Sequence, residues 1–180
     1  MNTKKLYNDL YWGLLFLAIS MDFNIVVYGV SVKIVGLILM RRGLKGFNQI
    51  NPVPEFGMAI KGCEIGMIFW AVMIAYKSAI MYMGIPGPIF NVLAYSIGWA
   101  VVQALVILNL FKGIQNYIRA DIYQNKIMML AGFIGLVCAM GCFVVLGVPM
   151  MSTIRMVAEI AMALMMIKQL NRSQFQLMDR

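Results

Sequence analysis

Two apolar runs stand back to back near the start of this chain and end at a basic cluster. Between Leu10 and Met40 the only ionisable residues are Asp22 and Lys33, and Arg41, Arg42 and Lys45 follow at once. A helix rises about 1.5 Å per residue and a bilayer core is about 30 Å thick, so one continuous helix here would be far too long. Two helices folded at Asn24–Ser31 fit that thickness, which predicts a membrane hairpin.

The composition places the whole chain in the same class. Of its 180 residues 62% are hydrophobic and only 12% are charged, against about 45–50% and about 25% in soluble domains. The net charge of +8 does not predict nucleic-acid binding, because the basic residues lie between apolar runs and not on one soluble face. The three cysteines, Cys63, Cys138 and Cys142, all lie in apolar segments, which favours packing roles over a disulfide framework.

The apolar pattern predicts an all-α, polytopic membrane protein with one transmembrane domain over residues 1–180. Six spans form three hairpins, over about 6–44, 56–111 and 127–170. The individual helices are expected at about Leu6–Ile25, Gly29–Leu44, Phe56–Met83, Pro88–Phe111, Ile127–Leu146 and Met151–Leu170. Prolines and glycines interrupt the chain between several of these runs.

One segment between the spans has its own pattern. In Lys112–Lys126 the residues Ile114, Tyr117, Ile118 and Ile122 recur at helical spacing against polar neighbours. Such a stripe is typical of an amphipathic helix that lies in the membrane interface. We therefore expect an interfacial helix over about 112–126.

The distribution of lysine and arginine predicts the orientation of the hairpins. The turns Val26–Ser31, Gly84–Ile89 and Gly147–Ser152 carry no Lys or Arg, whereas the opposite side collects most of the basic residues. Because cytoplasmic loops are enriched in Lys and Arg, both termini are expected in the cytoplasm.

The residues that are missing exclude much chemistry. The chain has no histidine, which intramembrane proteases with an imidazole base, HExxH metalloproteases and most haem proteins require. Three scattered cysteines are too few for a cysteine-only zinc site, and neither a Walker A motif nor GxSxG is present. We expect no catalytic residue, no metal and no cofactor.

Ionisable and amide side chains inside the predicted spans remain as candidates for a ligand or ion site, since each is costly in lipid. Asp22 and Lys33 should lie at similar depth across the first turn and form a pair. Glu64, about 10 Å deep, is too short to reach water and has Gln103 as its expected partner across the second hairpin. The other candidates are Glu159, near mid-bilayer, and Arg155, one turn away on the same face. Structural roles, namely long side chains reaching the interface and polar groups holding helices together, remain open for all six.

The first hairpin also resembles a known group of proteins. GLLFLAISMDFNI, a short linker and then GLILMRRGLKGF, over roughly Leu14–Phe47, are similar to the opening of small uncharacterised multi-span membrane proteins of Gram-positive bacteria. The Pro-Asp that often follows the turn in that group is missing here. The resemblance implies a bacterial cytoplasmic membrane and a six-span plan, with no activity attached.

Three functions follow from these observations. The first is a non-enzymatic subunit or partner of a larger membrane assembly, whose cationic face meets anionic lipid headgroups, a protein partner or a second copy of the chain. The second is a small-solute binding or transport protein with a polar site among Glu64, Gln103 and Glu159. The size and span count, which are similar to those of the substrate-binding subunits of energy-coupling-factor vitamin transporters, fit that alternative by architecture alone. The third is an enzyme that acts on a lipid.

Overall fold

The computed structural model describes residues 3–18, 22–25, 28–83, 89–118, 124–145 and 150–178. In chain order the elements are α1 (Thr3–Ala18), β1 (Asp22–Ile25), β2 (Tyr28–Ser31), α2 (Val32–Ile50), α3 (Pro54–Met83), α4 (Ile89–Gln103), the π-helix η1 (Ala104–Leu108), α5 (Asn109–Ile118), α6 (Gln124–Val145) and α7 (Met151–Met178). Helix therefore dominates, as the sequence predicted, and a two-stranded antiparallel sheet is added to it.

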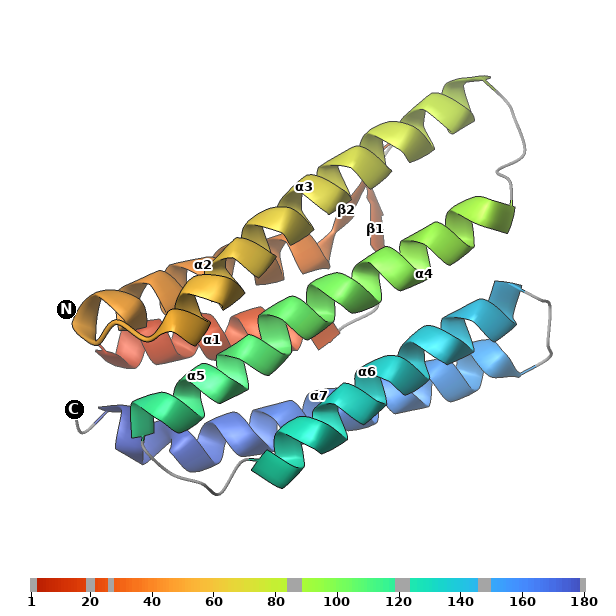
Figure 1. The fold of residues 1–180 in the computed structure, drawn as a ribbon. Helices are drawn as coiled ribbons and strands as arrows, with labels where there is room; N and C mark the ends of the chain where they lie inside the picture. Colours follow the sequence, from red (N-terminus) through yellow and green to blue (C-terminus); the bar gives the residue numbers. More distant parts are fainter. Residues whose placement is uncertain are drawn as a thin grey trace.

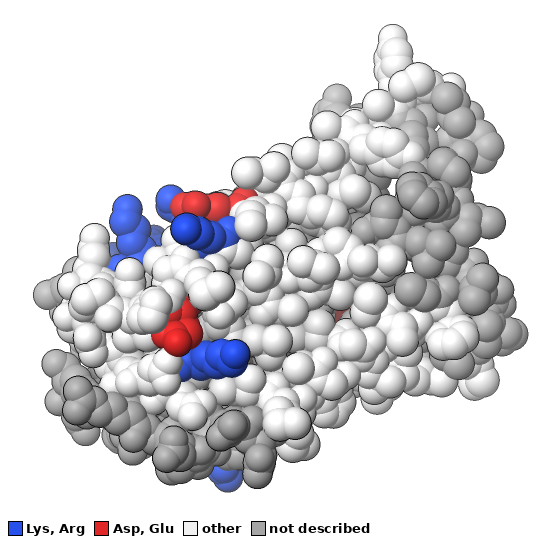
Figure 2. Space-filling view, viewed as in Figure 1, with Lys and Arg blue, Asp and Glu red and all other residues white. Residues whose placement is uncertain are grey.

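The helices lie side by side, and the chain reverses direction between neighbouring helices except along α4, η1 and α5, which form one continuous line (Figure 1). The start of α1, the junction of α2 with α3, the end of α5 and the end of α7 share one end of the bundle. A hydrogen bond joins the chain's two ends there, from the Tyr7 hydroxyl to Asn171 Oδ1 at 2.7 Å. We call this the basic end, because the Lys and Arg side chains visible in Figure 2 lie toward it.

Glycines set the closest helix contacts. Gly13 and Gly36 bring the backbones of α1 and α2 together, and Gly43 and Gly46 of α2 continue that contact against Leu10 and Leu6. Between α3 and the η1 region, Gly62 and Gly66 leave room for residues 102–106. Such small residues permit the close approach that van der Waals packing between apolar helices needs.

The first hairpin differs from the prediction at its turn. The expected helices Leu6–Ile25 and Gly29–Leu44 are shifted, since α1 ends at Ala18 and α2 runs on to Ile50. Between them β1 pairs with β2, with Asn24 opposite Gly29. Aromatic and β-branched residues alternate with small polar ones there, and this pattern favours a strand over a helix.

The predicted interfacial helix Lys112–Lys126 is also divided. Its first part, to Ile118, continues the line of α4 as α5, whereas Gln124 already begins α6. The stripe residue Tyr117 is buried at the basic end, its ring 6.1 Å from that of Phe47. The apolar face therefore packs on α2 and α3, and residues 119–123 lie outside the described part of the chain.

Within the described residues, two helices are long and apolar enough to cross a membrane, Pro54–Tyr76 and Ser96–Ile118, while Ile127–Met140 is a shorter apolar helix. The prediction of six spans is therefore not established by helix length and composition. The long apolar helix of α3 is largely turned outward, since only 28% of its most apolar window is buried.

Candidate functional site

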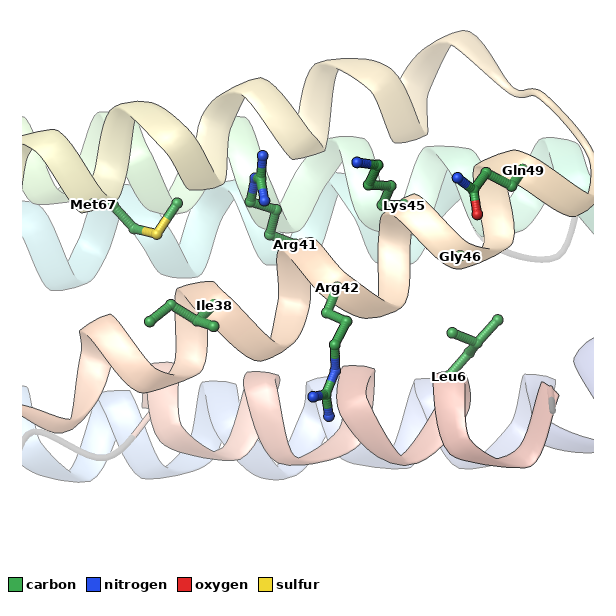
Figure 3. A pocket seen from close by; sticks show the side chains of 8 residues that line it. All are labelled: Leu6, Ile38, Arg41, Arg42, Lys45, Gly46, Gln49 and Met67. Atoms are coloured by element: carbon green, nitrogen blue, oxygen red, sulfur yellow. The ribbon is translucent and has the colours of Figure 1, made fainter. Parts of the chain in front are cut away.

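A groove of about 500 Å³ runs along α2 at the basic end, between α1 and α3. Figure 3 shows the eight residues that line it: Leu6, Ile38, Arg41, Arg42, Lys45, Gly46, Gln49 and Met67. Three of them are cationic and three have large apolar side chains. The groove is thus amphipathic, with charged donors beside an apolar wall.

Arg42 forms the wall on the α1 side, where its guanidinium points down in Figure 3. Its Nε donates to Asp9 Oδ2 at 2.6 Å and its Nη2 donates to the other oxygen, Oδ1. Asp9 is buried, whereas 57% of the Arg42 side chain is exposed. Because an arginine is always charged in proteins, this two-point contact is a charge-assisted pair that fixes the position of the guanidinium.

Arg41 points the other way, toward α3. Its Nε and Nη2 both reach Glu64 Oε1 at 2.9 Å, and both side chains are a little over 40% exposed. Glu64 thus pairs with Arg41 in place of its expected partner Gln103, which is buried. The sequence predicted a helix through Arg41 but not its pairing with Glu64, because an apolar pattern does not show which neighbouring helix a side chain faces.

Lys45 and Gln49 extend the α3 side of the groove. They follow Arg41 at four-residue intervals, so the three polar side chains form one stripe on α2. Lys45 is exposed, and no ion pair joins it to another residue in the described ranges.

A second polar region lies buried in the middle of the bundle. Lys33 is only 4% exposed, and its Nζ lies 5.0 Å from the ring centroid of Trp99 and 5.8 Å from that of Trp70. The two indoles meet edge to face at 5.8 Å. An ammonium over indole rings gains cation–π attraction, which partly offsets the loss of its hydration. Sequence reasoning found Lys33 and missed both tryptophans.

Glu159 is buried at the same level as Lys33. Gly46 of α2 and Asn171 of α7 contact neighbouring residues of α1, Leu6 and Tyr7. Lys33 precedes Gly46 by 13 residues and Glu159 precedes Asn171 by 12, and at about 1.5 Å per residue both lie about 18–20 Å from the basic end. The core therefore holds a basic and an acidic side chain at about one depth.

Gln103 is buried as well, and it lies level with Glu64. On α3, Gly62 and Gly66 stand on either side of Glu64, and they contact residues on either side of Gln103, namely Leu105, Val106 and Val102. One and two turns before Gln103, Trp99 Nε1 and Ser96 Oγ are buried, with no hydrogen-bond partner among the described side chains and backbone. We call Lys33, Gln103 and Glu159 the buried polar layer. Glu64 is only partly buried, and although it lies level with Gln103 its carboxylate turns to Arg41.

The side chains of the remaining two candidates, Asp22 and Arg155, lie outside the described part of the chain. Asp22 is in β1, where its backbone pairs with Ser31, and Arg155 is in α7. The predicted pair of Asp22 with Lys33 and the predicted contact of Arg155 with Glu159 therefore stay predictions. Among the side chains that are described, no three Cys, Asp or Glu gather as a metal site would require.

No protein-family model, curated protein or solved structure matches this chain.

Proposed function

We propose that this chain is a six-span, non-enzymatic protein of a bacterial cytoplasmic membrane that works as a subunit or partner of a larger membrane assembly. Both termini lie in the cytoplasm, and the basic end meets the anionic headgroups of the cytoplasmic leaflet. The observation that carries the proposal is the separation of a charged end from apolar flanks.

The flanks expose large apolar side chains on several helices. On α3, Ile68 and Val72 are 65% and 59% exposed, and on α7 Leu164 is 64% exposed. Further examples lie on α4 and α6, at Ile97, Val101, Met128 and Met129. Exposure of so much apolar surface to water is unfavourable, whereas lipid or a partner helix would cover it.

One flank has the character of a contact surface for another helix. Gly132 and Gly135 on α6 are exposed, and a Cβ added at either would meet no atom within 4 Å. Inside this chain, by contrast, Gly13, Gly36, Gly62 and Gly66 each accommodate a neighbouring helix. Small residues turned outward in the same way support association of α6 with a partner helix in the membrane.

Native mass spectrometry of the full chain extracted with its surrounding lipid tests this proposal. We expect a mass above that of the single 20.2 kDa chain, from a second copy or another subunit, and Gly135→Leu should shift the protein to the single-chain mass. Gly57→Leu is the matched control, because Gly57 also has nothing within 4 Å of its added Cβ but lies on α3 at the basic end. A single chain in both the unmodified protein and the control would refute the assembly role.

The buried polar layer favours a second function, small-solute binding or transport. Lys33, Gln103 and Glu159 supply an amine, an amide and an acid inside the bundle, a combination that can bind a polar solute. Mass spectrometry of small molecules that copurify with the protein tests it. A solute that is lost from Glu159→Gln and retained by Glu64→Gln would favour this function over the first.

A further inference from the structure

We propose that the groove between α1, α2 and α3 holds the phosphodiester headgroup of an anionic glycerophospholipid, with Arg41 and Lys45 as its phosphate ligands. This inference rests on the proposed function in one respect, namely that the basic end lies at the surface of the membrane. It adds a defined binding site to what would otherwise be a general attraction of a basic surface to an anionic leaflet.

The donors are arranged along one side of the groove. Arg41, Lys45 and Gln49 follow each other at successive turns of α2, and Figure 3 shows Arg41 and Lys45 both extending toward α3. Successive turns are about 5.4 Å apart, so neighbouring donor groups can reach oxygens of one phosphate. Gln49 adds an amide N–H at the outer end of the stripe.

The ion pairs orient the two arginines without using all their donors. Arg41 places Nε and Nη2 on a single oxygen of Glu64, which leaves Nη1 for an incoming anion. Arg42 is held by Asp9 on the opposite wall. The three cations exceed the two carboxylates by one charge, so the groove as a whole attracts an anion.

The apolar wall selects a lipid over a free anion. Ile38 lies one turn before Arg41 on α2, is 50% exposed, and faces the groove together with Met67 of α3. Both lie on the side of the cations that leads away from the basic end. A molecule with phosphate at one end and a hydrocarbon chain at the other matches this order, with its chain running along Ile38 and Met67. Inorganic phosphate would leave the apolar wall unused.

Titration of the full-length protein in detergent with phosphatidylglycerol, followed by native mass spectrometry, tests the site. Lys45→Gln is the main variant, because Lys45 is exposed and makes no ion pair in the described ranges. A basic residue near an anionic lipid surface contributes about 1 kcal/mol, which converts to about a fivefold loss of affinity for phosphatidylglycerol. Lys112→Gln, which removes an exposed lysine of α5 outside the groove, should leave the affinity unchanged.

Two further arms separate the sources of binding. Ile38→Asn should weaken phosphatidylglycerol binding, whereas competition by inorganic phosphate should be weak for every variant. Phosphatidylcholine, whose headgroup is neutral overall, should bind less well than phosphatidylglycerol to the unmodified protein. Equal losses for Lys45→Gln and Lys112→Gln, full competition by inorganic phosphate, or equal binding of the two lipids would each overturn the site.

The lipid site and the assembly role can each be present without the other. Lipid binding that depends on Lys45 in a protein of single-chain mass would support the lipid site while the assembly role fails. An assembly with no selective loss in Lys45→Gln would leave the assembly role standing and overturn the lipid site.

Discussion

Gly13 and Gly36 place the backbones of α1 and α2 in direct contact. A Cβ built on Gly13 would lie 3.0 Å from the carbonyl oxygen of Gly36, and one built on Gly36 would lie 2.9 Å from the carbonyl oxygen of Gly13. Because each glycine faces the other's carbonyl, neither site can take a side chain unless the helices separate. The first hairpin is held at this crossing.

Gly13→Ala should therefore destabilise the protein. The added methyl group would also lie 2.9 Å from the backbone nitrogen of Met40, and overpacking of this kind costs about 1–3 kcal/mol. Gly57→Ala is the control, since nothing lies within 4 Å of its added Cβ and alanine favours helix over glycine by about 1 kcal/mol. Thermal unfolding in detergent measures both. A Gly13→Ala protein as stable as the control would contradict the backbone contact.

The sequence predicted the apolar segments better than their ends. Periodicity and hydropathy placed the helical regions and the general sense of each hairpin, because burial of apolar residues repeats along the chain. The strands at Asp22–Ile25 and Tyr28–Ser31 were missed because the apolar run continues through them. In such a run, hydropathy alone does not distinguish a strand from the end of a helix.

The sequence predicted how deep the candidate residues lie in the bundle, but not which neighbouring helix each side chain faces. Counting residues from helix ends placed Glu159 deep in the bundle, and it is buried. The same counting placed Glu64 level with Gln103, which the contacts of Gly62 and Gly66 support, but its carboxylate turns toward Arg41 on α2. Which neighbour a helical side chain faces depends on the rotation of each helix about its axis, and rotation follows from packing at glycines such as Gly62 and Gly66.

Asp9 and Arg42 should respond unequally to substitution. Asp9 is buried and Arg42 is largely exposed, so Arg42→Met leaves a carboxylate in the core without its bidentate partner. Asp9→Asn removes that charge and leaves the arginine in water. We expect Arg42→Met to lower the unfolding temperature more than Asp9→Asn does. Arg172→Met, at an exposed position on α7, is the control. Equal effects of the two substitutions would show that the buried carboxylate does not need Arg42.

Both ends of the chain should lie in the cytoplasm. The Tyr7–Asn171 hydrogen bond joins α1 to α7 at the basic end, so the two termini cannot lie on opposite sides of a membrane in this fold. Fusions of a cytoplasmic and a periplasmic reporter to each terminus measure this orientation. The cytoplasmic reporter should be active at both ends. Opposite results at the two ends would imply an odd number of spans and refute the six-span proposal.

The last prediction concerns the buried ammonium of Lys33. Its Nζ lies 5.0 Å from the centroid of Trp99, and a desolvated cation over an indole contributes about 0.5–2 kcal/mol. A double-mutant cycle isolates this contribution, because Lys33→Met and Trp99→Leu each also change the packing of the core.

In that cycle we expect the double variant to lose less unfolding free energy than the two single variants lose together, by about 0.5–2 kcal/mol. Once Lys33 is replaced by methionine, removal of Trp99 no longer costs the attraction between charge and ring.

The control cycle combines Lys33→Met with Trp12→Leu. Trp12 is 49% exposed on α1 and packs against Tyr11 and Phe16, so its effect should add to that of Lys33→Met. Both cycles are measured by reversible unfolding in detergent. Additivity with Trp99 as well as with Trp12 would mean that Lys33 gains nothing from the indole and is held in the core by other contacts.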